Sequence, residues 1–559
     1  MNKISKTIAA GAMALMAAGC VEEYVPQTNI ATSQQAAGAN GAYDNFVNTV
    51  TSTLSGQFTY AGSDYRAYDF GYPTFYLMWD CMGQDMVYQY LNWYDSWYCM
   101  QQYLGPTYAV TQMPWTYYYK WIKNCNVVLS LAGDEPAEQQ KAGAGIALAM
   151  RALYYLDMAQ MFAPETYTRD KAALTVPIIT EKVDNNAAQD NPRATNEEMY
   201  AFIISDLDRA EQYLAGHKRE DKYSPDISVV YGLKARAYLI MGEWANARKY
   251  AKMAQEGYSL LTEAEYTDRN NGFNTPDNGS WMLACHYKED DPNIKYNDGD
   301  SSWGSQMCLE VDPEESGCGY ASNYGQFWLI DRHLYETMPK SDFRRKCFVD
   351  FALDELATEE EKIEALKAYS DYPESVYNTG VKTSSSYSGL GGLSLKFRLA
   401  GGEAGRKNQM IGFCVAVPMM RVEEMYLIEA EAAGMMNEAE GVELLTKFAK
   451  TRDAEYEYGK HNEAYGNTAN TKFQNEVWWQ RRVEFWAEGL ATKDIKRYGK
   501  GIIRSYAGSN HVDQYRWNTT TTPSWMTLNI VQTEGNYNKA LVNNPAPAPM
   551  NGNSPEFAW

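Results

Sequence analysis

Aromatic side chains are concentrated in one stretch of the sequence. Between Tyr72 and Trp121, 17 of 50 residues are Tyr, Trp or Phe, against 14% in the whole chain. Sugars present faces of polarised C–H groups that stack on flat rings, and their hydroxyls need polar partners nearby. Binding sites of this kind combine an apolar platform with a few placed polar groups. Residues 88–98 interleave both kinds of side chain and supply the first candidate ligand contacts, Asn92, Trp93, Tyr94 and Trp97.

A second aromatic group lies in the turn-rich, polar segment 281–328. Rings in polar loops indicate binding more strongly than rings on helices, because loops on a scaffold often carry function. The candidates in this group are Tyr296, Trp303, Tyr324 and Trp328, with Tyr296 and Trp303 favoured. The alternative for both groups is burial, since Tyr and Trp are also common in protein cores. We expect core packing for the helix-like residues 115–121.

The sequence contains little that is typical of an enzyme. It has no GxSxG, HExxH or phosphate-cradling loop, and its five histidines are scattered, which gives no support to a metal centre or a His-based triad. Glycoside hydrolysis needs two carboxylates across a cleft, and counting cannot identify such a pair among 71 acidic residues. We therefore predict a binding protein without a cofactor. Four acidic residues could form a calcium-binding loop but lack EF-hand spacing, so that solvated carboxylates are the alternative: Asp290, Asp291, Asp298 and Asp300.

The charge balance restricts the partners. The chain carries a net charge of −21 from 50 basic and 71 acidic residues. Nucleic-acid binding needs clustered Lys and Arg, and an anionic lipid surface would repel this protein. A neutral or cationic ligand fits better.

The N-terminal residues indicate export. Lys3 and Lys6 precede an apolar run, 8–19, which at 12 residues is shorter than the roughly 20 that cross a bilayer and fits a signal peptide. Small residues stand directly before Cys20, an arrangement that resembles the bacterial lipobox, in which the cysteine is lipidated. Its alternative is an ordinary secretory signal. Of the eight other cysteines we expect most to be buried thiols, although an exported protein could pair some of them, and Cys308 with Cys318 closes the shortest loop.

Helical spacing marks two parts of the chain. In 228–256, small residues at Ala235, Gly242, Ala247 and Ala254 match the close-packing positions of a tetratricopeptide helix pair, and Gly434 with Ala439 repeats part of that spacing. A capping box, Thr195 to Glu198, predicts a helix start, and Ser224-Pro225-Asp226 predicts another, with the proline in the first turn.

Composition and spacing along the chain predict six segments. They are a signal peptide at 1–19, a flexible tether at 20–42, a helical scaffold at 43–260 with an aromatic-rich insertion at 60–110, an irregular ligand-presenting lobe at 261–414, a second scaffold part at 415–500 and an irregular C-terminal segment at 501–559.

Four blocks of the chain resemble the SusD/RagB family of Bacteroidetes nutrient-uptake lipoproteins. They are AMRALYYLDMAQMF (149–162) followed by VPIIT (176–180), RATNEEMYAFIISDLDRAEQYL (193–214), PMMRVEEMYLIEAEAAG (418–434) and QRRVEFWAEGLATKDIKRYG (480–499). The last block departs from the family pattern at Gln480, Ala491 and Thr492. Glu22 and Glu23, just after Cys20, resemble the signal that sends such lipoproteins to the outer face of the outer membrane.

The resemblance implies a fold and a role. It implies a mainly α fold, with about four tetratricopeptide-like helix pairs and an irregular lobe packed on them. It also implies a surface protein, held to the membrane only by its lipid, that binds a glycan and passes it to a TonB-dependent transporter. Peptide binding with the same transporter is the alternative, and a pure assembly scaffold is a third. For the charged residues of the last block we expect a structural ion-pair network: Arg481, Arg482, Glu484, Glu488, Asp494, Lys496 and Arg497.

Overall fold

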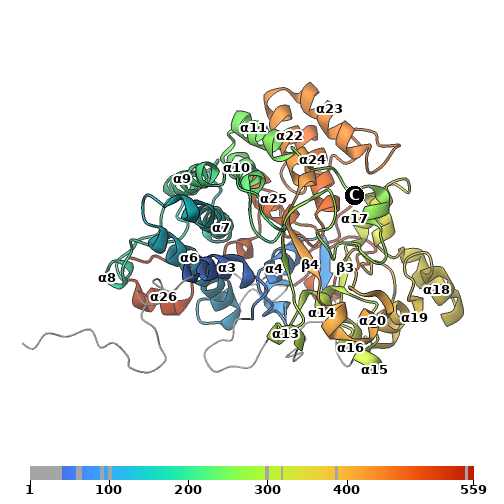
Figure 1. Ribbon diagram of the computed structural model, residues 1–559. Helices are drawn as coiled ribbons and strands as arrows, with labels where there is room; N and C mark the ends of the chain where they lie inside the picture. Colours follow the sequence, from blue (N-terminus) through green and yellow to red (C-terminus); the bar gives the residue numbers. More distant parts are fainter. Residues whose placement is uncertain are drawn as a thin grey trace, which may run out of the picture. The chain divides into compact units, whose positions relative to one another are not determined.

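A computed structural model describes most of the chain after residue 40 (Figure 1). The described residues are 41–57, 66–88, 93–98, 104–295, 301–316, 319–383, 388–547, 550 and 552–559. The chain divides into two compact units, Met1–Phe46 and Val47–Trp559. The second unit holds nearly all the described residues and both groups of candidate rings. Cys20, Asn92 and Tyr296 lie outside the described residues, and so do Asp298, Asp300 and Cys318.

A row of antiparallel helices forms the scaffold of the second unit. Its members are α6 (Ala109–Ala132), α7 (Glu138–Phe162), α9 (Asn196–Tyr213), α10 (Ile227–Met241), α11 (Trp244–Ala254), α22 (Val422–Met436) and α23 (Glu438–Ala449), followed by α24 (Lys472–Glu484) and α25 (Ala491–Tyr498). The most extensive packing joins α7 to α9, α10 to α11, α11 to α22 and α22 to α23. Figure 1 shows the row running from α6 and α9 to α22 and α23. The prediction of a mainly α, tetratricopeptide-like fold is confirmed.

The small residues predicted for one helix pair do allow its helices to approach. Ala235, Ala247 and Ala254 are fully buried, and Gly242 ends α10 with a φ of 71°, a left-handed conformation that suits glycine. In the next pair the prediction was only half right. Ala439 is exposed, and the close approach to Gly434 is made instead by Gly441, where an added Cβ would lie 2.2 Å from the Gly434 Cα.

Two predicted helix starts can be compared with the structure. The capping box is confirmed: Thr195 N–H donates to Glu198 Oε2 at 2.8 Å, and Glu198 N–H donates to Thr195 Oγ1 at 3.2 Å. The second helix, α10, starts later than predicted. Its N-cap is Asp226, whose carboxylate accepts from Ser228 N–H and Val229 N–H, so the proline precedes the helix instead of standing in its first turn.

Short elements make up the irregular lobe and the loops around it. Two antiparallel strand pairs occur there, β1 (Met86–Tyr88) with β3 (Trp328–Ile330), and β2 (Trp281–His286) with β4 (Ala416–Arg421). The helices of the lobe are α12 (Glu263–Tyr266), α13 (Pro292–Lys295), α14 (Trp303–Met307), α15 (Pro313–Ser316), α16 (Tyr320–Tyr324), α17 (Arg332–Thr337), η3 (Phe343–Cys347), η4 (Phe351–Glu355), α18 (Glu359–Leu366), α19 (Pro373–Tyr377), η5 (Asn378–Thr383), α20 (Gly402–Lys407) and α21 (Gln409–Gly412).

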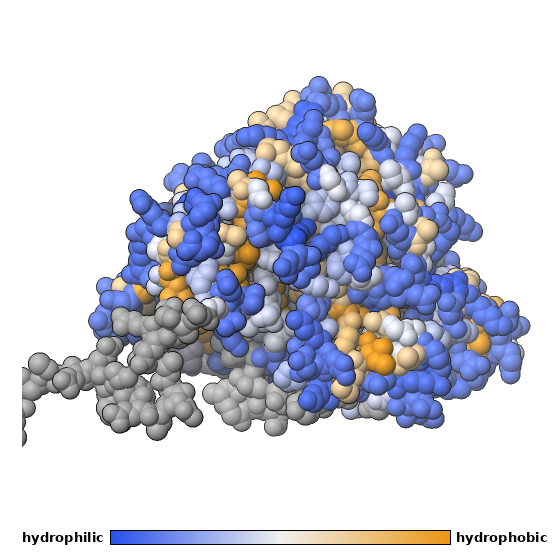
Figure 2. Space-filling view, in the orientation of Figure 1, coloured by the Kyte–Doolittle hydropathy of each residue, from blue (hydrophilic) through white to orange (hydrophobic). Residues whose placement is uncertain are grey.

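The remaining short helices flank the scaffold row or follow it. They are α3 (Ala42–Ser52), α4 (Thr74–Met82), α5 (Asp95–Tyr98), α8 (Asn185–Ala188), η6 (Asp513–Tyr515), η7 (Ser524–Met526) and α26 (Gln532–Tyr537). No helix among the described residues combines the length and apolar character that a membrane span requires. Figure 2 shows hydrophilic side chains over most of one face, with apolar groups gathered in small areas, one of them near α20.

The described cysteines are thiols, as expected for most of them: Cys81, Cys125, Cys285, Cys308, Cys347 and Cys414. All but Cys414 are buried.

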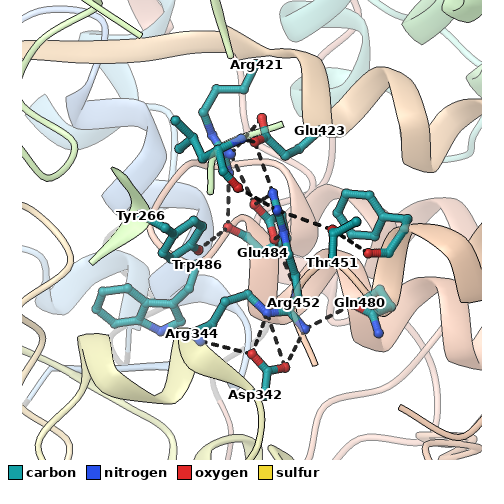
Figure 3. Close-up of polar contacts among 12 residues, drawn as sticks. Tyr266, Asp342, Arg344, Arg421, Glu423, Thr451, Arg452, Gln480, Glu484 and Trp486 are labelled. Atoms are coloured by element: carbon teal, nitrogen blue, oxygen red, sulfur yellow. Dashed lines mark hydrogen bonds and ion pairs between the residues drawn. The ribbon is translucent and has the colours of Figure 1, made fainter. Parts of the chain in front are cut away.

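A buried network of charges joins the lobe to the helical row (Figure 3). At its centre lies Glu484, the last residue of α24. Arg421 at the end of β4, Arg344 in η3 and Arg452 after α23 donate to its carboxylate at 3.1, 3.2 and 3.1 Å. The carboxylate is fully buried. Four separate segments of the chain therefore meet at one side chain.

Further carboxylates balance the positive charges of this network. Asp342 accepts from Arg344 at 2.7 Å, Glu423 from Arg452 at 3.0 Å, and Glu488 from both Arg421 at 2.8 Å and Lys396 at 2.6 Å. The network thus pairs four carboxylates with three guanidiniums and one ammonium. Burial alone would raise the pKa of Glu484, but the guanidiniums of Arg452, Arg421 and Arg344 hold that pKa well below its usual range.

The other charged residues of the last block are also buried and paired. Arg482 donates to Asp85 Oδ1 at 2.5 Å, Arg481 and Arg497 share the Asp494 carboxylate, and Arg497 also pairs with Glu431. Lys496 instead donates to two backbone carbonyls. The expected structural ion-pair network is confirmed, although most of its partners lie outside the block.

Replacing Glu484 with glutamine should destabilise the fold strongly. The variant Glu484→Gln leaves guanidiniums buried without a matching charge, a change that costs about 3–5 kcal/mol. We expect this loss in the free energy of unfolding, measured with urea at pH 7. Because the folded-state pKa is depressed, the carboxylate stabilises the fold above the unfolded pKa of about 4.3. The difference in the free energy of unfolding between the wild type and Glu484→Gln should therefore shrink as the pH falls below about 4.3.

The matched control for this variant is Glu360→Gln, at an exposed position in α18. It should leave the free energy of unfolding almost unchanged. Equal stability of Glu484→Gln and the wild type at pH 7 would contradict the central place given to this network.

Candidate functional site

The two groups of candidate rings meet in one aromatic cluster. Pairing of β1 with β3 sets Tyr88 opposite Trp328, and their rings stack with centroids 4.4 Å apart. Tyr94 packs edge-on against Trp328 at 5.0 Å, and Trp97 lies 5.5 Å from Tyr94 and 5.3 Å from Tyr68. We call Tyr68, Tyr88, Tyr94, Trp97 and Trp328 the ring cluster.

Burial of this cluster corrects part of the site prediction. Tyr94 and Trp97 are fully buried, and Trp328 is 2% exposed. Trp303 is also buried, because it packs against Tyr76 at 6.1 Å and Phe397 at 4.9 Å. The sequence offered these four rings as candidate ligand contacts, with burial as the alternative, and the structure uses them as packing. None of the four has a free face for a ligand.

Two of the predicted residues keep rings that reach the surface. Trp93 is partly exposed and packs edge-on against Tyr68 at 6.1 Å, with the Arg66 guanidinium 5.2 Å from its ring. Tyr324 is 51% exposed and lies 5.8 Å from Tyr320. We call Trp93 and Tyr324 the rim.

Helix α14 positions both sides of the rim. Tyr320 N–H, one turn before Tyr324, donates to Ser305 Oγ at 2.6 Å. Ser301, just before the helix, donates to Arg66 O at 2.6 Å, and Gln306 donates to Ala67 O at 3.2 Å. Trp303 anchors the same helix in the core. In this structure Trp303 therefore serves as packing for the helix.

A buried arginine from the C-terminal segment holds the chain below the rim. Arg504 is fully buried and donates to three backbone carbonyls, those of Cys81 at 2.9 Å, Gly83 at 2.9 Å and Tyr98 at 2.7 Å. Tyr98 in turn bonds to His511 Nδ1 at 2.8 Å. Sequence reasoning missed Arg504, because its partners lie more than 400 residues away along the chain and no local pattern marks it.

The exposed side chains of this region can take part in ligand binding. Partly exposed rings can stack on sugar faces, and Arg66 adds a fixed positive group beside Trp93. Among the described residues, His, Cys, Asp and Glu form no group of three that could hold a metal ion. Asp291, one of the predicted calcium ligands, accepts instead from Lys288 N–H at 2.8 Å and from Ser55 at 3.3 Å.

Removing the Arg504 guanidinium should loosen the segment below the rim. In Arg504→Lys a single ammonium cannot reach all three carbonyls, and each buried carbonyl left without a donor costs about 1–3 kcal/mol. We expect a lower free energy of unfolding and faster amide hydrogen exchange in residues 81–98. The control is Arg332→Lys, at a side chain that is 40% exposed. It should change neither the free energy of unfolding nor the hydrogen exchange of residues 81–98. Unchanged exchange in 81–98 of Arg504→Lys would refute this role.

Two family models match the sequence. A SusD-like model described as "Starch-binding associating with outer membrane" matches residues 72–239, and the SusD family model matches residues 357–547. The second match contains two of the four blocks in which the resemblance was noted, and the first contains the other two. No curated protein is detectably similar in sequence.

Solved structures share the fold over most of the chain. A SusD-like carbohydrate-binding protein from Bacteroides vulgatus is 21% identical, with a TM-score of 0.67, and the match covers 90% of this chain and 97% of that one. The surface glycan-binding protein A from Bacteroides thetaiotaomicron, solved with laminarihexaose, is 17% identical, with a TM-score of 0.64 and coverage of 90% and 98%. At such identities the likeness concerns the fold.

Proposed function

The chain belongs to the SusD/RagB family, and from this premise we propose that it is a cell-surface lipoprotein that captures oligosaccharides and hands them to a TonB-dependent transporter. The observation that carries the proposal is the rim: Trp93 and Tyr324 reach the surface, and each packs against a neighbouring tyrosine, Tyr68 or Tyr320. A ring backed by packed rings loses little conformational freedom when it stacks on a sugar. Asn92 and Tyr296, which lie outside the described residues, remain proposed ligand contacts.

Several features support the surface location and the partner. The family description names association with the outer membrane. We propose lipidation of Cys20 as the anchor and 20–42 as the tether, which would let the body move while it stays attached. A binder held in this way needs a transporter to carry its ligand across the membrane, and the TonB-dependent barrel that the family resemblance implies would do so.

A binding role without catalysis also fits the ring-based site. Two of the structural neighbours are described by their ligands. One is a glycan-binding protein in complex with laminarihexaose, and the other is a laminarin-binding protein. The protein's net charge of −21 favours neutral glycans over sulfated or uronic ones. We propose neutral oligosaccharides as the ligands and no chemical change of the glycan on binding.

Single alanine substitutions in the rim test the proposal. Calorimetric titration of the full chain with maltoheptaose, laminarihexaose and a panel of other neutral oligosaccharides should identify a glycan that binds. For that glycan, Trp93→Ala and Tyr324→Ala should each raise the dissociation constant about tenfold, which corresponds to roughly 1.4 kcal/mol. Both residues are partly exposed, so the melting temperature should change little.

Tyr537→Ala provides the matched control. Tyr537 is 42% exposed and lies in α26, away from the residues of the ring cluster in the sequence. This variant should bind as the wild type does. Binding of peptides with no heat from any glycan would contradict the proposal and favour the peptide-binding alternative. Shorter glycan products after incubation would contradict the absence of catalysis.

A further inference from the structure

A pocket of about 510 Å³ lies apart from the rim. The turn before α10, the loop after α12, strand β2 and residues 414–416 at the start of β4 form its walls. None of the ring-cluster or rim residues lines it. Its volume lies within the roughly 300–1,000 Å³ of sites that hold small molecules.

Aromatic side chains form one wall and the inner end of the pocket. Tyr223 and His286 lie at the wall with ring centroids 3.8 Å apart, and both are partly exposed. Behind them Phe273, Trp281 and Tyr287 are buried and line the inner end. The pocket thus combines an accessible aromatic pair with an apolar end.

Amide and carboxylate groups supply the polar lining. Among the described lining residues are four asparagines and three carboxylates, and none is Lys or Arg: Asn270, Asn271, Asn274, Asn278, Glu265, Asp268 and Asp277. Burial lowers the pKa of His286 to about 4, so this imidazole is neutral at pH 7. The lining is therefore negative overall, which disfavours an anionic ligand.

Hydrogen bonds fix the walls without a ligand. Lys222 Nζ donates to Pro276 O at 2.9 Å and to Asn278 O at 2.5 Å, which holds the loop against the start of α10. Asn274 Nδ2 donates to Leu399 O at 2.9 Å and ties the same loop to the lobe. These hydrogen bonds fix the loop at several of its residues, so the pocket is preorganised, and binding there would require little ordering.

Some polar groups on the outer side of the pocket are left for a ligand. Asp268 is used within the loop, because its Oδ1 accepts from Asn270 N–H and Asn271 N–H at 2.7 and 2.9 Å. Asp277 and the side chain of Asn270 are exposed at the edge of the pocket. An amide beside a carboxylate and a tyrosine can bond several hydroxyls, and the carboxylate can also bind an amino group.

We propose that this pocket is a second ligand site, which binds the end of a neutral or amino-bearing sugar chain. Tyr223 and His286 pack against the sugar ring, Asn270 bonds its hydroxyls, and Asp277 favours an amino sugar over a neutral one. The pocket excludes uronic acids and sulfated sugars by charge. This site is independent of the rim, so that either can be lost without the other.

Ligand-observed NMR titration of the full chain at pH 7 with glucose, glucosamine and glucuronate tests this pocket. We expect glucosamine to bind best, glucose more weakly and glucuronate not detectably. Tyr223→Ala should raise the dissociation constant for glucosamine at least tenfold. Asp277→Asn, an isosteric change at an exposed position, should abolish the preference of glucosamine over glucose. Tyr213→Ala, at a partly exposed tyrosine of α9, should bind as the wild type does.

Each contrary outcome would overturn the second site. These outcomes are glucuronate binding as tight as glucosamine binding, no binding of any of the three sugars, or unchanged binding by Asp277→Asn and Tyr223→Ala. If Tyr223→Ala does not fold, the result for Asp277→Asn decides. The rim is judged separately in Trp93→Ala. Loss of oligosaccharide binding with unchanged glucosamine binding supports both sites. Unchanged binding of both ligands rejects the rim and keeps the pocket, and loss of glucosamine binding in this variant rejects the pocket.

Discussion

The burial of Glu484 is the constraint on which the rest of the structure depends. A carboxylate without solvent must be matched by charges and hydrogen-bond donors, because an unpaired buried ion costs several kcal/mol. Here the donors are Arg344, Arg421 and Arg452, which come from the lobe, from the strand that leads into α22 and from the turn after α23. Charge matching at one residue therefore fixes how the irregular lobe packs on the helical row.

The same packing supports the proposed binding surface. Arg482, two residues before Glu484, pairs with Asp85 at 2.5 Å, and Trp486 Nε1 donates to Asp85 O at 2.9 Å. Asp85 directly precedes β1, which carries Tyr88 into the ring cluster. Arg504 also donates to a backbone carbonyl after β1, that of Tyr98. The chain on both sides of β1 is therefore held by hydrogen bonds from distant parts of the sequence. Rigid support of this kind lowers the entropic cost of ligand binding.

Local signals in the sequence predicted the helical part well. The capping box at Thr195 and the buried alanines of α10 and α11 follow from chemistry between residues close in the chain, and the charged last block was expected to be structural. The partners of those charges did not follow, since Asp85 lies 397 residues from Arg482. Gly441 was missed for a related reason: the residue that α22 approaches depends on the exact turn at Asn437, which spacing alone does not define.

Several of the rings predicted to contact a ligand are buried, and two of them stay at the surface. Trp97, Trp303 and Trp328 stand in polar, turn-rich sequence, which is typical of exposed rings. They are buried because distant segments pair, as Tyr88 does with Trp328 across 240 residues. No local sequence pattern shows that a distant segment will cover a ring. Trp93 and Tyr324, in the same kind of sequence, stay at the surface because no segment among the described residues covers them completely.

A crystal structure of the protein with the tightest-binding oligosaccharide would test the central claim most directly. The account predicts sugar rings in van der Waals contact with the faces of Trp93 and Tyr324, and a ring cluster whose side chains keep the positions they have without ligand. An oligosaccharide bound elsewhere, with neither Trp93 nor Tyr324 in contact, would contradict the claim that the rim captures the glycan.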